Sequence, residues 1–109
     1  SLGISATYVS NRNADNNQKI QNKAIQDIKK NLQNGRPVII LVRSGPDSRY
    51  TGFAHYMVLV GYNSKGIPII ADPNGGRCRT ENTLEEIVKK YIYANSDSGS
   101  EQGYVLINS

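Results

Sequence analysis

The feature that most restricts the fold is a pair of short apolar runs that follow one another along the chain. HYMVLVGYN occupies residues 55–63 and IPIIADP occupies residues 67–73, with only SKG between them. Each run has the length of a strand, and the Ser-Lys-Gly stretch is typical of a turn. Two strands joined in this way form a hairpin, so the sequence predicts that the chain is built around an antiparallel sheet.

A long amphipathic helix is expected at about residues 15–33. Asn34 and Gly35 supply the left-handed end that stops such a helix, and Pro37 prevents its continuation. The apolar face of the helix is formed by residues at steps of about four: Ile20, Ala24, Ile25, Ile28 and Leu32.

Three further segments complete the expected fold, an α+β domain with a mostly antiparallel sheet. PVIILVRS at 37–44 is an unbroken apolar run rich in β-branched residues, and it predicts a strand buried on both faces. A capping box beginning at Thr83 opens a short helix that ends near Tyr93. LGISATYVS at 2–10 fits either a short strand or an extended segment. The expected strands are 38–43, 55–62, 67–72 and 103–108, with loops at 45–54, 74–80 and 94–102.

The length, charge and composition of the sequence exclude several classes of protein. With 109 residues the chain has the length of one domain, and its net charge of +4 comes from scattered basic residues, so no nucleic-acid partner is expected. No apolar stretch approaches the roughly 20 residues of a membrane helix. One cysteine and one histidine do not suffice for a closed zinc site, so we expect no metal and no cofactor. Because the chain starts at Ser1 and its one methionine is Met57, inside an apolar run, we expect it to be a segment of a longer protein.

The turn of the hairpin decides whether two polar residues meet. If residues 64–65 form a two-residue turn, counting along both strands places Met57 opposite Asp72. His55, the only histidine, is two residues from Met57 and therefore on the same face, within reach of the carboxylate. A one-residue bulge at Gly66 would put His55 and Asp72 on opposite faces.

Two interpretations of this pair stay open. A lone histidine at the start of a strand can be a half-buried polar residue, and an aspartate before proline often serves a turn. The largely apolar neighbours of His55 favour a second interpretation, because an unpaired imidazole there costs free energy and a carboxylate would orient it. A histidine held by an acid beside a glycine-rich loop is the general-base half of a nucleophilic site.

Two stretches of the sequence resemble one family: GRPVIILV at 35–42 and AHYMVLVGYNSKGIPIIADP at 54–73. The chain is similar, over roughly residues 20–73, to the bacteriocin-processing double-glycine peptidases, which are papain-like cysteine peptidases. The resemblance implies a papain-like fold, with a long N-terminal helix and one short helix. It also implies that residues 1–109 are the C-terminal, sheet-bearing part of a single peptidase domain.

The resemblance also assigns catalytic residues. His55 matches the family's catalytic histidine, the base that would deprotonate a thiol, and Asp72 matches the residue that orients it. The family's nucleophilic cysteine and the glutamine of its oxyanion hole would both lie upstream of this segment. Cys78 follows His55 and has an arginine on each side, which would favour its thiolate, but we expect an incidental loop cysteine. Ser44 lacks the signature of a nucleophile elbow and is expected to be a turn residue.

Three functions remain open from the sequence. The first is a bacterial cysteine peptidase that hydrolyses peptide bonds. This segment of it would be inactive alone, because it lacks the nucleophile. The second is a non-catalytic peptidase-like module that binds a peptide or partner protein, and the third is a small α+β interaction domain. Expected partners are a peptide or protein substrate, the upstream part of the domain and, through exposed apolar surface, further copies. An extracellular or cell-surface location fits a protein without disulfides, and a cytoplasmic location fits equally.

Overall fold

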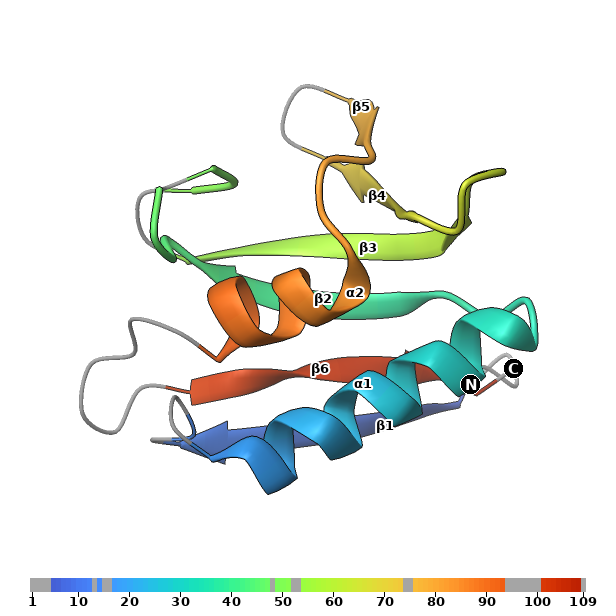
Figure 1. Cartoon of the computed structure of the whole chain (residues 1–109). Helices are drawn as coiled ribbons and strands as arrows, with labels where there is room; N and C mark the ends of the chain where they lie inside the picture. Colours follow the sequence, from blue (N-terminus) through green and yellow to red (C-terminus); the bar gives the residue numbers. More distant parts are fainter. Residues whose placement is uncertain are drawn as a thin grey trace.

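The protein places a helical layer on one face of an antiparallel sheet (Figure 1). A computed structural model describes residues 5–12, 14, 17–47, 49–51, 54–73, 76–93 and 101–108, with Arg12 and Arg77 described by their backbone. Its elements are β1 (Ala6–Arg12), α1 (Gln18–Gln33), β2 (Val38–Arg43), β3 (Ala54–Tyr62), β4 (Pro68–Asp72), β5 (Arg77–Arg79), α2 (Leu84–Glu86), the π-helix η1 (Ile87–Ile92) and β6 (Glu101–Ile107). The described strands pair in the order β1-β6-β2-β3-β4-β5, each pair antiparallel. The predicted α+β class with an antiparallel sheet is therefore confirmed.

The core lies between the sheet and a layer formed by α1 and the α2–η1 segment, which lie on the same face (Figure 1). Ile28 and Leu32 of α1 are buried in this core, while Ile20 and Ile25 are partly buried against it. Complete burial of a side chain such as Ile28 contributes about 1.5 to 3 kcal/mol. The sheet supplies the opposite wall of the core through Val38, Ile40, Val42, Met57, Leu59 and Ile70.

α1 begins and ends at residues that favour helix termini. The side chain of Asn17 accepts a hydrogen bond from the backbone amide three residues on, at 3.1 Å, and Gly35 has a φ of 72° just past the helix. At the same end, Nδ2 of Asn31 donates to the carbonyl of Pro37 at 2.9 Å and to that of Ile107 at 3.1 Å. Since β1 precedes it, α1 is the second element of the described chain and not the N-terminal one.

The capping box predicted at Thr83 is confirmed. Oγ1 of Thr83 accepts a hydrogen bond from the Glu86 amide at 3.2 Å, and Oε1 of Glu86 accepts one from the Thr83 amide at 2.9 Å. The chain then continues as η1, at whose end the amide of Tyr93 donates to the carbonyl of Val88, five residues back. Neither α1 nor the α2–η1 segment, the helices of the described chain, has the length and apolar character needed to cross a membrane.

The other face of the sheet carries no helix of the described residues (Figure 1). One row of directly paired residues crosses this face from β1 to β5: Tyr8, Val105, Ile39, Val58, Ala71 and Cys78. Beside the row, the side chains of Tyr56 and Val60 are 56% and 49% exposed. The prediction that β2 is buried on both faces is confirmed only in part. Helices cover the face that carries Val38, Ile40 and Val42, whereas on the other face Leu41 is buried and Ile39 is half-buried.

Three segments differ from the expected boundaries. The opening segment, compatible with a strand or an extended chain, forms β1 and pairs with β6 along its whole length. Arg77–Arg79, expected within a loop, form β5 because they pair with β4. β6 begins at Glu101 and so includes the last two residues of the loop predicted at 94–102. Residues 94–100 lie outside the described residues.

Candidate functional site

His55 and Asp72 are hydrogen-bonded to each other across the hairpin. Nε2 of His55 lies 2.9 Å from Oδ1 of Asp72. His55 is the second residue of β3 and pairs with Val42 of β2, while Asp72 is the last residue of β4. The Asp72 side chain is 6% exposed and that of His55 is 25% exposed, so a buried carboxylate holds a partly accessible imidazole. The prediction that these side chains face the same side of the sheet and lie within bonding distance is confirmed.

The loop of the hairpin is one residue longer than predicted. The amide of Asn63 donates to the carbonyl of Ile67 at 2.9 Å, which encloses residues 64–66, and the glycine at the end of this loop has a φ of 79°. A three-residue loop that ends in a left-handed glycine is a common hairpin connection. Taken alone, the extra residue would put His55 and Asp72 on opposite faces of the sheet.

A bulge in β3 cancels the extra residue of the loop. The pairing of β3 with β4 shifts between Leu59 and Gly61, so that Val60 is an additional residue of β3. Beyond the bulge the register is the predicted one, and its continuation places Met57 opposite Asp72. The predicted turn is therefore wrong, while the predicted register at the far end of the hairpin is right.

The bond to Asp72 decides which imidazole nitrogen can act as a base. A carboxylate only accepts hydrogen bonds, so Nε2 of His55 carries the hydrogen and donates it to Oδ1. In the neutral ring the lone pair then lies on Nδ1, for which the described part of the chain offers no hydrogen-bond partner. This tautomer can take a proton from a group that approaches Nδ1, and the carboxylate stabilises the resulting imidazolium.

The second carboxylate oxygen of Asp72 faces a guanidinium group. Nη1 of Arg79 lies 3.7 Å from Oδ2 of Asp72, and the Arg79 side chain is only 14% exposed. Nε of Arg79 donates to Oε1 of Glu81 at 2.5 Å, and Nη2 donates to the carbonyl of Arg49 at 3.1 Å. Cζ of Arg79 lies 4.6 Å from the centroid of the Tyr50 ring, in a cation–π contact. One cation thus joins Asp72 to two other segments of the chain.

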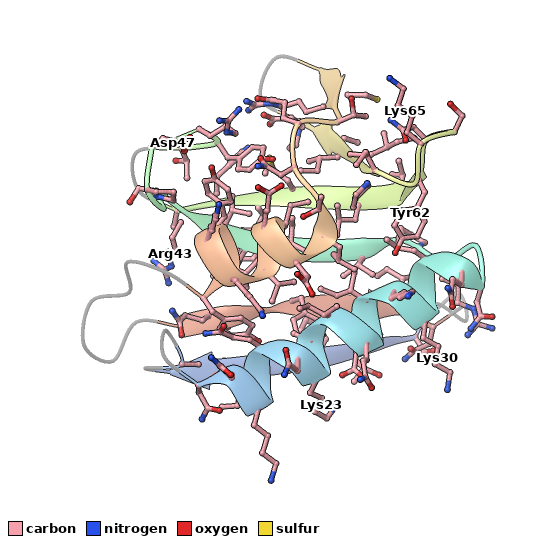
Figure 2. The ribbon with its side chains drawn as sticks, in the orientation of Figure 1. Lys23, Lys30, Arg43, Asp47, Tyr62 and Lys65 are labelled. Atoms are coloured by element: carbon pink, nitrogen blue, oxygen red, sulfur yellow. The ribbon has the colours of Figure 1, made fainter. Side chains whose placement is uncertain are left out.

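The same network includes Asp47 and Arg49, which lie between β2 and β3. Arg49 donates to Oε2 of Glu81 and to Oδ2 of Asp47, each at 3.0 Å, and Oη of Tyr91 donates to Oδ1 of Asp47 at 2.8 Å. The Tyr91 hydroxyl, helped by Arg49, lowers the pKa of Asp47, and hydrogen bonds from Arg79 and Arg49 lower the pKa of Glu81. Both carboxylates are therefore ionised at neutral pH. Figure 2 labels Asp47 at this end of the sheet, beside the α2–η1 segment.

Cys78, one of the two other candidate nucleophiles, belongs to the opposite face of the sheet from this pair. Cys78 is exposed in β5 and pairs with Ala71, so its side chain belongs to the uncovered face and that of Asp72 to the other. Cys78 and Asp72 line a common recess of about 310 Å³ at the edge of the sheet, but His55 does not line it. Ser44 directly follows β2 and begins the next loop. The structure joins His55 to Asp72 and places Cys78 on the other face of the sheet.

A larger groove, of about 490 Å³, lies on the uncovered face of the sheet. Ile39, Leu41 and Tyr56 are among its lining residues. Tyr56 directly follows His55 in β3, so the two side chains point to opposite faces and the groove does not reach the imidazole. Within the described residues, no group of three His, Cys, Asp or Glu side chains is placed to hold a metal ion.

Arg79 is the residue of this site that sequence reasoning missed. In a strand, Arg79 shares the face of residue 77, which pairs with Asp72, so the alternation in RCR was the available signal. The glycines that precede RCR favour a loop, in which no face can be assigned. Glu81 and Arg49 were missed for the same reason, since both lie in connections whose path the apolar pattern does not define.

Comparison with known proteins adds a family to this geometry. A family model, that of the Peptidase_C39 like family, matches residues 3–99. The matched range runs from before β1 to beyond η1 and includes both His55 and Asp72. No curated protein matches the chain significantly, and no solved structure does.

Proposed function

This chain belongs to the peptidase C39-like family, and we propose that it supplies the general base, His55, and the orienting acid, Asp72, of a cysteine peptidase. The observation that carries the proposal is the 2.9 Å bond between Nε2 of His55 and the buried carboxylate of Asp72. A buried acid that holds an accessible imidazole in one tautomer is the arrangement by which a histidine activates a nucleophile.

The proposed reaction is hydrolysis of a peptide bond through an acyl-enzyme. Nδ1 of His55 takes the proton of a thiol, and the thiolate sulfur attacks the carbonyl carbon of the substrate. The imidazolium returns the proton to the amide nitrogen as the carbon–nitrogen bond breaks. A water molecule then attacks the thioester and gives its proton to Nδ1, and the thiol leaves with that proton. Asp72 stabilises the imidazolium in both steps and stays ionised.

The nucleophile is proposed to lie upstream of Ser1. In this proposal the whole domain has a papain-like fold, and residues 1–109 are its C-terminal, sheet-bearing part. The placement of Cys78 supports a nucleophile from elsewhere, because Cys78 lies on the face of the sheet opposite to Asp72. The proposed partners are a peptide or protein substrate and the upstream part of the domain. Because apolar side chains line the uncovered face, the segment without that part is expected to self-associate.

Thiol chemistry in the longer protein tests this function. Alkylation of a cysteine upstream of Ser1 by iodoacetamide is followed as a function of pH, together with cleavage of peptide substrates. An ion pair with His55 should keep the thiolate reactive well below the ordinary thiol pKa of about 8.5. His55→Gln should lose this reactivity at low pH, and its peptide hydrolysis should fall by roughly a thousandfold or more.

Lys65→Gln is the matched control, because Lys65 is exposed at the far end of the hairpin from His55 (Figure 2). This variant should retain the alkylation profile and the rate of the wild type. Equal low-pH alkylation in the wild type and in His55→Gln would reject the proposed base. Peptide binding without any reactive upstream thiol would instead identify a non-catalytic module.

A further inference from the structure

Arg79 lies next to the proposed pair and has no part in the proton transfers. We propose that Arg79 is a positioning residue, which holds the ionised carboxylate of Asp72 in the orientation that bonds His55. The inference rests on the proposed function, because it assigns how the acid of that site is kept in place. Its basis is a set of contacts that holds Arg79 beside Asp72.

The buried carboxylate of Asp72 has a histidine at one oxygen and a guanidinium near the other. One oxygen of the carboxylate accepts the hydrogen of His55, and the other lies 3.7 Å from Nη1 of Arg79. Burial favours the protonated form of a carboxylate, whereas an adjacent guanidinium favours its charged form. The charged form is the one that can only accept a hydrogen bond from Nε2 and so determines the tautomer of His55.

Arg79 is itself held from three directions. Glu81 accepts a hydrogen bond from its Nε, the carbonyl of Arg49 accepts one from its Nη2, and the ring of Tyr50 lies against its Cζ. Tyr50 in turn donates to Oδ1 of Asn82 at 2.6 Å, so the ring has a fixed position. A planar guanidinium can serve these contacts together, and a lysine ammonium cannot.

The charges of the network alternate in sign. From Asp72 the order is Arg79, Glu81, Arg49 and Asp47, with each residue adjacent to a partner of opposite charge. Glu81 contacts both guanidinium groups, so neither cation lacks a counterion. The three carboxylates exceed the two guanidinium groups by one negative charge, and the imidazolium formed on proton transfer balances that charge.

Nuclear magnetic resonance can test this role, because His55 is the only histidine of the chain. The pKa of Asp72 is measured from the chemical shift of its carboxyl carbon, which Asp72→Asn assigns. A second measurement gives the rate at which the Nε2 hydrogen of His55 exchanges with water. Arg79→Gln should raise the pKa of Asp72 by about one unit or more. Arg79→Lys keeps the positive charge but not the planar set of donors, and it should raise the pKa of Asp72 by less than about half as much. Both variants should exchange the Nε2 hydrogen several times faster than the wild type.

Arg49→Gln is the matched control, since Arg49 bonds Glu81 and not Asp72. It should shift the pKa of Asp72 by less than about a third of the Arg79→Gln shift. An unchanged pKa of Asp72 in Arg79→Gln would overturn the inference. If Arg79→Gln does not fold, Arg79→Lys decides, and an unchanged exchange rate of the Nε2 hydrogen would overturn it. If these shifts are observed but the longer protein, with the residues upstream of Ser1, is inert toward peptides, the proposed function is rejected and the positioning role is retained.

Discussion

Nε2 of His55 lies 2.9 Å from Oδ1 of Asp72, although the loop between their strands is one residue longer than a two-residue turn. The contact depends on the bulge at Val60, which restores the register that the longer loop displaces. The pair is thus set by two irregularities of the hairpin that compensate each other.

Deletion of Val60 should leave the pair intact. Without this residue, Gly61 still pairs with Ile69 and Leu59 with Ile70, and β3 becomes a regular strand. Because the Val60 side chain is 49% exposed, its loss should change the free energy of unfolding by no more than about 1 kcal/mol. Urea unfolding gives the free energy, and the Nε2–H resonance of the single histidine reports the bond to Asp72.

Deletion of Val58 is the contrasting variant. His55 and Leu59 point to the same face of β3, with three residues between them. Removing one of these three forces either Leu59 out of the core or His55 away from the face of Asp72. We expect loss of the Nε2–H resonance or a destabilisation of about 2 kcal/mol or more. Equal behaviour of the two deletions would show that the bulge does not set the register.

The apolar pattern of the sequence predicts the sheet and its helices because burial follows periodicity. The four-residue spacing of Ile28 and Leu32 places both in the core, and the capping box fixes the start of α2 at Thr83. The bulge could not be predicted in this way, because the apolar runs on both sides of it are unbroken. β5 could not be predicted either, since it has three residues, two of them arginines, and its pairing with β4 is a long-range contact.

Gly45→Ala should be strongly destabilising. Gly45 has a φ of 64°, and a Cβ at this position would lie 2.5 Å from the carbonyl oxygen of Lys90 and 2.6 Å from Cδ1 of Tyr91. Left-handed strain and the collision together should cost about 2 to 4 kcal/mol. Gly35→Ala is the control. Gly35 has a φ of 72°, and apart from its chain neighbours no atom of the described residues lies within 4 Å of such a Cβ, so strain alone should cost about 1 kcal/mol. Equal losses in urea unfolding would mean that the loop is not docked on η1.

Stability should fall at alkaline pH in part through Tyr93. Burial, together with the charge of Asp27, raises the pKa of Tyr93 from 10.0 to about 12, and its hydroxyl donates to Oδ1 of Asn11 at 2.8 Å. A raised pKa means that this contribution is complete below pH 10 and is lost as the pH rises toward 12. The loss should be of the order of 2 kcal/mol. Tyr93→Phe should flatten the fall of the unfolding free energy in that interval, and an unchanged slope would contradict the assignment.

The chain of 109 residues should hydrolyse no peptide by itself. His55 can accept a proton and Asp72 can orient it, but an acyl-enzyme needs a nucleophile next to Nδ1, and the exposed thiol of Cys78 belongs to the other face of the sheet. Incubation with peptide substrates, with and without iodoacetamide, should give the same negligible cleavage. Cys78→Ser should not alter that result, since removal of a thiol outside the pair removes no reacting atom. Cleavage that iodoacetamide blocks and Cys78→Ser abolishes would make Cys78 the nucleophile, and the thiol would then have to reach the imidazole around the edge of the sheet.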